Sequence, residues 1–213
     1  MTSIAVIAAN GKAGSRIVEE AANRGLDVTA VVRGENRTKA KRVISKDLFD
    51  LTGEDLSGFD VVVDAFGAWT EETLPQHSTT LKHLADVLSG TETRLLVVGG
   101  AGSLYVNPEH TVQLNQTEGF PDAYQPVATA MGRSLAELRE RSDVNWTYIS
   151  PAADFRPDGE RTGSYVLAGE EFTTDEHGIS AISYADYAIA VVDVATGANG
   201  TGSHNRERIS VRW

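Results

Sequence analysis

Cysteine is absent from the 213 residues of the chain. Disulfides, thiolate metal ligands and cysteine nucleophiles are therefore excluded, and the absence fits the reducing cytoplasm, where we expect this protein to be found. Long apolar runs are missing too, because the most apolar segment, residues 4–9, is too short to span a bilayer. The first residues also lack the basic region and long apolar stretch of a signal peptide. We therefore expect no membrane partner.

Signatures of several common enzyme classes are lacking as well. Ser103 does not lie in the G-x-S-x-G turn that presents a nucleophilic serine. No G-x-x-x-x-G-K-[ST] phosphate loop is present, which removes the usual nucleotide hydrolases. Histidine is scarce and its spacing does not suit a metal site, so we expect no metal. The five histidines are His77, His83, His110, His177 and His204.

Positive charge is in short supply, with 19 lysines and arginines against 30 aspartates and glutamates and a net charge of −11. Such a surface repels phosphate backbones, which argues against nucleic acids as partners. One segment is an exception, because residues 33–46 hold six cations and the single acid Glu35. The cations are Arg33, Arg37, Lys39, Lys41, Arg42 and Lys46.

The first 33 residues contain the pattern around which the chain is organised. An apolar run at residues 4–9 meets N-G-K-A-G at residues 10–14, a stretch with helical periodicity follows, and residues 27–33 form a second β-branched run. A strand, glycine turn, helix and strand in this order are typical of a dinucleotide-binding unit. The alternative is an ordinary strand-to-helix turn in a flavodoxin-like protein.

The glycine turn has the chemistry that a dinucleotide needs. Gly11 and Gly14 have no Cβ, so the backbone can approach a diphosphate, and the first turn of the helix offers free N–H groups. Ala8 stands where the first glycine of the usual pattern would be. The turn supplies five candidate cofactor contacts: Asn10, Gly11, Lys12, Ala13 and Gly14.

The basic segment bears on which nicotinamide cofactor is bound. Arg33 lies 19 residues after Gly14, close to the position where an acid would bind the ribose of NAD and an arginine the 2′-phosphate of NADP. We therefore expect NADP(H) to be preferred over NAD(H), with Arg33 as the main ligand and Arg37 or Lys39 assisting. The alternative is a solvated basic helix face.

The remaining pattern predicts a Rossmann-type doubly wound parallel sheet, an α/β fold, in a single domain over residues 1–213. Residues 154–182 are expected to form a small substrate-side lobe, with a hairpin strand at residues 163–168. The other predicted strands are residues 42–45, 60–67, 94–98, 145–150 and, at the sheet edge, 208–213. The predicted helices are residues 74–88, 128–141 and 183–195, the last capped by Ser183.

Several motifs along the chain resemble one known group. N-G-K-A-G, V-V-R at residues 31–33, V-V-G-G-A-G-S-L-Y at 97–105 and W-T-Y-I-S-P-A at 146–152 carry the likeness, and R-T-G-S-Y at 161–165 and S-Y-A-D-Y-A at 183–188 extend it. These are similar to atypical short-chain dehydrogenase/reductases of the NAD(P)H-flavin reductase type, which are akin to biliverdin reductase B and the NmrA-like proteins. The likeness runs along nearly the whole chain.

The resemblance implies that NADPH lies across the strand ends. Asp47 and Leu48 would lie near the adenine, and Phe66 and Gly67 on the adenosine side. Ser103 and Tyr105, the candidate catalytic residues, would lie near the nicotinamide ring. Ser150, Pro151 and Ala152 would lie beside the nicotinamide. Gly99 and Gly100 are further candidate contacts because they follow a predicted strand. Phe66 could instead cap the core, and Ser103 could bond only its own glycine loop.

One further absence narrows the chemistry. Classical short-chain dehydrogenases use a tyrosine activated by a lysine four residues on, but Tyr124 is followed at that spacing by Ala128, and no lysine occurs after Lys82. A flavin acceptor does not need that pair, because hydride passes between stacked rings. We therefore expect FMN or FAD as substrate, with Trp69, Tyr105 and Phe155 as walls of the site. Tyr105 or Tyr124 is a candidate unaided proton donor. Arg161 is a candidate contact to a flavin phosphate, and the alternative is an ordinary surface arginine.

Three functions remain open. The first is a reductase that passes hydride from NADPH to a flavin or similar planar small molecule. The second is a non-catalytic sensor that binds NADP(H) and regulates a partner, and the third is an isomerase or epimerase that retains NADP. Oligomers are compatible with each of them.

Overall fold

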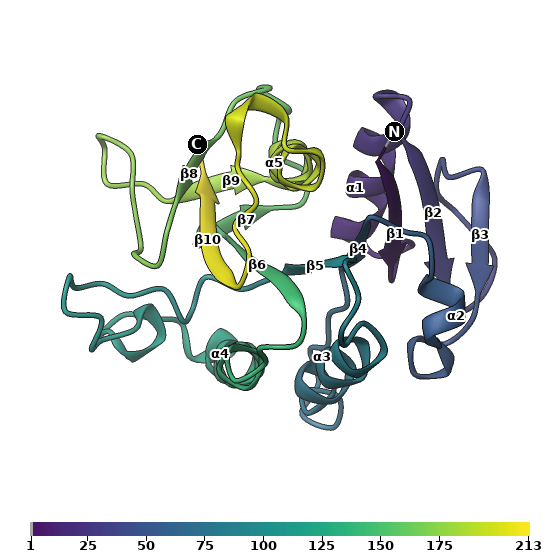
Figure 1. The fold of residues 1–213 in the computed structure, drawn as a ribbon. Helices are drawn as coiled ribbons and strands as arrows, with labels where there is room; N and C mark the ends of the chain where they lie inside the picture. The colour runs from purple at the N-terminus through teal and green to yellow at the C-terminus, as the bar shows by residue number, and fades with distance from the viewer. Residues whose placement is uncertain (1) are drawn as a thin grey trace.

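The computed structural model describes residues 2–213 and is built around one eight-stranded sheet (Figure 1). Neighbouring strands pair in parallel except β10 and β8, which are antiparallel. In spatial order the strands are β3 (Arg42–Ser45), β2 (Asp27–Val32), β1 (Ser3–Ile7), β4 (Val61–Asp64), β5 (Arg94–Val98), β6 (Asn145–Pro151), β10 (Glu207–Arg212) and β8 (Val166–Ala168). A separate two-stranded parallel sheet joins β7 (Asp154–Arg156) and β9 (Ala181–Ser183).

Helices cover both faces of the large sheet. The pair α1 (Lys12–Asn23) and α5 (Tyr184–Thr196) packs on one face, and α3 (Gln76–Val87) and α4 (Gln125–Arg139) pack on the other (Figure 1). Short helical segments complete the connections: α2 (Gly53–Leu56) and the 3₁₀ turns η1 (Leu48–Asp50), η2 (Leu114–Gln116), η3 (Asp122–Tyr124) and η4 (Ala198–Gly200). Among residues 2–213, no helix has the length and apolar character needed to cross a bilayer.

Strand β4 shows why the sequence folds this way. Its valines alternate between faces, so that Val61 and Val63 join the core under α1 and α5 while Val62 joins the core under α3 and α4. A strand buried on both faces needs apolar residues at consecutive positions, and this is what its sequence provides. The predicted doubly wound parallel sheet is confirmed.

Local signals located several elements correctly. The strands predicted at residues 42–45 and 94–98 are β3 and β5. Ser183 caps α5 as predicted, because its Oγ accepts the N–H of Asp186 at 3.0 Å. Helix α4 begins at Gln125, before the predicted start, since a proline in the first helical turn loses no hydrogen bond there.

Two predictions about the C-terminal part were wrong. Residues 208–213 were expected at the sheet edge, but β10 lies between β6 and β8. The strand expected to form a hairpin at residues 163–168 is β8, and it pairs with β10 rather than with a neighbour in sequence. Both errors concern long-range pairing, which local hydrophobicity does not encode. The substrate-side role of residues 154–182 stays a prediction.

Candidate cofactor and active site

The carboxyl ends of β1 and β4 are the natural place for a ligand. Strand β1 has β2 on one side and β4 on the other, and the chain reverses its direction of travel across the sheet at this point. In open α/β sheets a crevice forms outside the strand ends at such a switch point. The glycine turn between β1 and α1 lies there (Figure 1).

The glycine turn is tight. Ala8 takes the place of the usual glycine with φ +55°, and its carbonyl accepts the N–H of Gly11 at 2.8 Å. A Cβ on Gly14 would lie 2.6 Å from the same carbonyl oxygen, and one on Gly11 would lie 3.1 Å from it. Position 14 therefore has no room for a side chain. Because Gly14 has none, α1 can begin directly beneath the turn.

The start of α1 fits an anionic group. No side chain caps this helix and no acid lies in its first turn. The first backbone N–H groups of a helix have no intrahelical acceptor, and they carry the positive end of the helix dipole. The predicted contacts Lys12, Ala13 and Gly14 form this first turn, and the site therefore fits the diphosphate of a dinucleotide.

Asn10 joins this turn to the basic segment. Its Oδ1 accepts the backbone N–H of Arg37 at 2.8 Å, and its Nδ2 donates to the carbonyl of Glu35 at 2.8 Å. Both ends of the amide are thus used in holding the loop that follows β2.

The basic segment is a loop over residues 33–41 followed by β3, not the helix face considered as an alternative. Three of its cations form ion pairs: Lys39 with Glu19, Arg42 with Asp27 and Lys46 with Asp55. Within the described chain, the exposed side chains of Arg33 and Arg37 form no ion pair. These two arginines are free to meet an anion.

The predicted adenine contacts follow β3. Asp47 caps the turn η1 by accepting the N–H of Phe49 at 3.0 Å, and Leu48 is buried in the core under α3 and α4. Their side chains shape this corner of the sheet.

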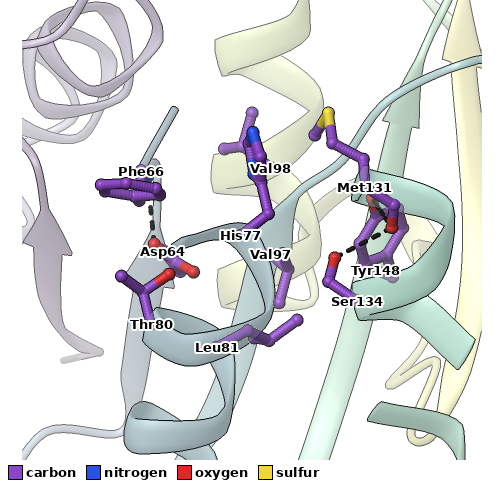
Figure 2. A pocket seen from close by; sticks show the side chains of 10 residues that line it. All are labelled: Asp64, Phe66, His77, Thr80, Leu81, Val97, Val98, Met131, Ser134 and Tyr148. Atoms are coloured by element: carbon purple, nitrogen blue, oxygen red, sulfur yellow. Dashed lines mark hydrogen bonds between the residues drawn. The ribbon is translucent and has the colours of Figure 1, made fainter. Parts of the chain in front are cut away.

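The end of β4 leads into a small pocket between α3 and α4 (Figure 2). Asp64 is buried, and its Oδ1 accepts the N–H of Phe66 at 3.0 Å, which turns the chain towards Gly67. Burial raises the pKa of Asp64 to about 6. The ring of Phe66 meets that of His77 edge to face at 5.8 Å, and burial lowers the pKa of His77.

Glycines after β5 let another loop pack tightly. A Cβ on Gly99 would lie 2.2 Å from the Tyr148 ring, and one on Gly100 would lie 2.9 Å from the sulfur of Met131. These glycines thus have a packing role that is independent of any cofactor contact.

The candidate catalytic residues Ser103 and Tyr105 are held by Arg208. This buried arginine donates to the Oγ of Ser103 at 3.3 Å and to its carbonyl at 3.0 Å, and lies 5.8 Å from the centre of the Tyr105 ring. Its charge is balanced by Glu170, which accepts from its Nε at 2.8 Å. Sequence reasoning did not single out Arg208, although its alternation with Ile209 and Val211 places it on the opposite face of β10.

Strand β6 ends in the predicted nicotinamide contacts. Ser150, Pro151 and Ala152 are all buried. The Oγ of Ser150 has no hydrogen-bond partner in residues 2–213, and the same holds for Ser210, its register partner on β10.

Comparison with known proteins agrees with this geometry. A family model described as NAD(P)H-binding matches residues 8–195. The chain belongs to this NAD(P)H-binding family. A Streptococcus pneumoniae structure described as a "putative NADH-flavin reductase" is 54% identical, with a TM-score of 0.95 over 100% of this chain and 99% of that chain. The resemblance stated from sequence is therefore confirmed.

Two further relatives are similar along most of their length. The uncharacterized protein YwnB of Bacillus subtilis is 46% identical over 194 residues, which is 89% of this chain and 90% of that protein. A Bacteroides thetaiotaomicron structure described as a "putative epimerase" is 33% identical, with a TM-score of 0.84 over 100% of this chain and 97% of that chain.

The four predicted substrate contacts lie in different settings in this NAD(P)H-binding protein. Trp69 and Tyr124 are exposed, at 69% and 56% of their surface. Phe155 is half-buried against the rings of Tyr184 and Tyr187, at 3.9 and 4.9 Å between centres. Their contact with a substrate stays a prediction, as does that of Arg161.

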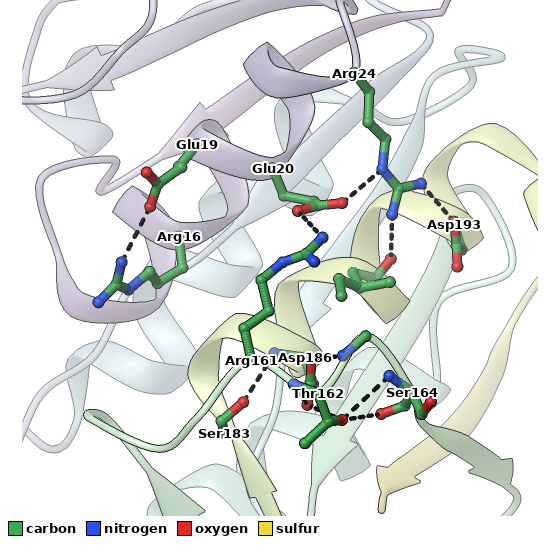
Figure 3. Close-up of polar contacts among 12 residues, drawn as sticks. Arg16, Glu19, Glu20, Arg24, Arg161, Thr162, Ser164, Ser183, Asp186 and Asp193 are labelled. Atoms are coloured by element: carbon green, nitrogen blue, oxygen red, sulfur yellow. Dashed lines mark hydrogen bonds and ion pairs between the residues drawn. The ribbon is translucent and has the colours of Figure 1, made fainter.

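Arg161 has a structural partner of its own. It donates to Glu20 on α1 at 3.0 Å, and Glu20 also accepts from Arg24, which in turn contacts Asp193 on α5 (Figure 3). The R-T-G-S-Y motif is thereby attached to α1 beside the contact between Arg24 and α5.

The same motif is anchored at Asp186. This buried carboxylate accepts the N–H of Thr162 at 3.0 Å, its hydroxyl at 2.6 Å and the N–H of Gly163 at 2.9 Å (Figure 3). It also accepts the indole N–H of Trp213 at 2.7 Å.

We predict that Asp186→Ala lowers the free energy of unfolding by about 2–4 kcal/mol, because several donors lose one buried acceptor. Chemical denaturation measures the loss. The control is Asp154→Ala, which removes an exposed pair with Arg156 and should cost less than about 1 kcal/mol. Equal losses in the two variants would contradict a special role for Asp186.

We predict that Asp64→Asn gains stability relative to wild type as the pH rises. The pKa of Asp64 is raised from 3.8 to about 6 in the folded state, so between these pH values the folded protein binds a proton that the unfolded chain does not. The free energy of unfolding of the wild type therefore falls as the pH rises from about 4 to about 6. The asparagine keeps the acceptor for Phe66 and does not titrate. The gain should approach about 3 kcal/mol at neutral pH.

Denaturation midpoints of both proteins at acid and neutral pH measure this effect. Asp60→Asn is the control of opposite sign, because the N–H of Ser3 lowers the pKa of Asp60. A constant difference between wild type and Asp64→Asn across the pH range refutes the prediction.

Proposed function

We propose that this protein is an NADPH-dependent reductase that transfers hydride to a flavin or a similar planar acceptor. The observation that carries the proposal is the joined pair of sites at the ends of β1 and β2: an uncapped helix start for the diphosphate, and the free cations Arg33 and Arg37 for the 2′-phosphate. The flavin-reductase description of the Streptococcus pneumoniae relative supports the acceptor class.

The chain's own residues bind and orient in this mechanism. The first turn of α1 holds the diphosphate, and the loop after β2 holds the adenosine end. Gly99, Gly100 and the end of β6 form the floor on the nicotinamide side, while Arg208 fixes Ser103 and Tyr105 beside it. When bound, the nicotinamide supplies the hydride, so the protein needs no tyrosine–lysine pair.

The nicotinamide specificity is the part of the proposal that departs from the relative's description, which specifies NADH. An acid at the end of β2 is the usual means of selecting NAD, and here Arg33 follows that strand. We therefore assign NADPH as the preferred reductant.

Steady-state oxidation of NADPH in the presence of FMN, FAD, riboflavin and quinones tests the reaction. We expect turnover above the uncatalysed background with at least one isoalloxazine. Absence of turnover with every acceptor would overturn the proposal, and tight NADP(H) binding without turnover would favour a redox sensor.

An NADP-retaining isomerase or epimerase is the second candidate, because one relative is described as an epimerase. It differs from the reductase in keeping its cofactor. Cofactor that co-purifies with the protein and does not exchange with added NADPH would favour this alternative.

We predict that Arg33→Asp weakens NADPH binding roughly tenfold to 100-fold more than NADH binding, because a charge-assisted bond to the 2′-phosphate is replaced by repulsion. Fluorescence titration with each cofactor measures the two dissociation constants. Lys41→Asp makes the same charge change at an exposed position of the same segment and should have a smaller effect. Equal weakening of both cofactors by Arg33→Asp would show that Arg33 has another role.

A further inference from the structure

The glycine turn and the basic loop are far apart in sequence but form one unit through a single side chain. Asn10 lies in the turn, 25 residues before Glu35 and 27 before Arg37. Its Oδ1 accepts the backbone N–H of Arg37, and its Nδ2 donates to the carbonyl of Glu35, at 2.8 Å in both bonds. The side chain therefore fixes the backbone of the loop at two points.

The rest of the loop is closed mainly on itself. Oδ1 of Asn36 accepts the N–H of Thr38 at 2.9 Å, and its Nδ2 donates to the carbonyl of Ala40 at 3.0 Å. These bonds shape the loop internally but do not attach it to the glycine turn. The ion pair between Lys39 and Glu19 is exposed, and such pairs contribute little. Ala40 anchors the far part of the loop in the core, and Asn10 is the side chain that hydrogen-bonds the part next to Arg37 to the glycine turn.

We propose that Asn10 is a positioning residue for cofactor selectivity, which acts by presenting Arg33 and Arg37 to the 2′-phosphate. This inference rests on the proposed use of NADPH. Because Asn10 bonds to the loop through both ends of its amide, we assign its contribution to the placement of the arginines rather than to direct contact with the ligand. A loop that is ordered before binding loses less conformational entropy when the ligand binds. The gain in affinity is therefore largest for NADPH, whose 2′-phosphate the loop contacts.

Two nucleotide fragments test the inference without any redox chemistry. Adenosine 2′,5′-bisphosphate carries the 2′-phosphate, and adenosine 5′-monophosphate lacks it. Asn10→Ala should weaken binding of the bisphosphate about tenfold and that of the monophosphate less than about twofold, as measured by calorimetry. Asn10→Ser, whose hydroxyl is too short to span both bonds, should behave in the same way and serves if the alanine variant does not fold.

Asn145 provides a matched control at the opposite end of the sheet. Its Nδ2 donates to the carbonyl of Thr91 at 3.3 Å, and its Oδ1 accepts from Asn205 at 3.2 Å, so this amide also bridges separate segments. Asn145→Ala should leave the selectivity between the two fragments unchanged.

A double-mutant cycle separates positioning from direct contact. In the background of Arg33→Ala with Arg37→Ala, removal of Asn10 should have no further effect on selectivity, because the groups that it presents are gone. An Asn10→Ala effect that is equal for both fragments, or that persists in this background, would show direct ligation and overturn the inference.

Limited trypsin digestion gives a second readout, because the loop contains cleavage sites at Arg33, Arg37, Lys39 and Lys41. Cleavage at these sites should be faster in Asn10→Ala than in wild type or Asn145→Ala, and unchanged cleavage overturns the inference. Equal binding of both fragments by wild type overturns the NADPH preference together with this inference. Absence of flavin turnover with intact fragment selectivity refutes only the reductase proposal.

Discussion

The site depends on how closely α1 can start beneath the end of β1. The carbonyl of Ala8 accepts from Gly11 and leaves no space for a Cβ at Gly14, so the helix begins in contact with the turn. This contact places the unpaired N–H groups of the first helical turn at the carboxyl ends of β1 and β4. A longer connection would leave the same groups facing water at a distance from the strand ends.

The position of α1 is also fixed by polar contacts with α5 and the R-T-G-S-Y segment on the same face of the sheet. Glu20 and Arg24 on α1 contact Arg161 and Asp193, and the hydroxyl of Tyr165 donates to Asp193 at 2.6 Å. The R-T-G-S-Y segment therefore acts as a polar strap between α1 and α5. A motif that suggested a substrate contact in the sequence has at least this structural role.

Features that depend on neighbouring residues could be predicted from the sequence. Short apolar runs located β3 and β5, a serine before an apolar helix located the cap of α5, and the glycine spacing located the turn. Features that depend on distant partners could not. The place of β10 inside the sheet, the burial of Arg208 beneath Ser103 and the several donors gathered at Asp186 all join segments whose proximity only the folded chain determines.

The difference between features set by neighbouring residues and features set by distant partners applies within the candidate site as well. The resemblance named the residues at each strand end, but it did not distinguish a side chain that faces a ligand from one that holds another segment. Asn10 and Ser103 are both candidate site residues, yet the structure shows their polar atoms bonded to Arg37 and Arg208.

The insertion of β10 between β6 and β8 also constrains the order of assembly. Both partners precede it in the chain, so until β10 is in place the backbone of β6 has one open edge and β8 has no pairing in the large sheet. Open edges in a partly folded chain invite pairing with other molecules. The strand that brings Arg208 to Ser103 therefore also covers the edge of β6, so the bonds that hold Ser103 depend on the same pairing that removes this open edge.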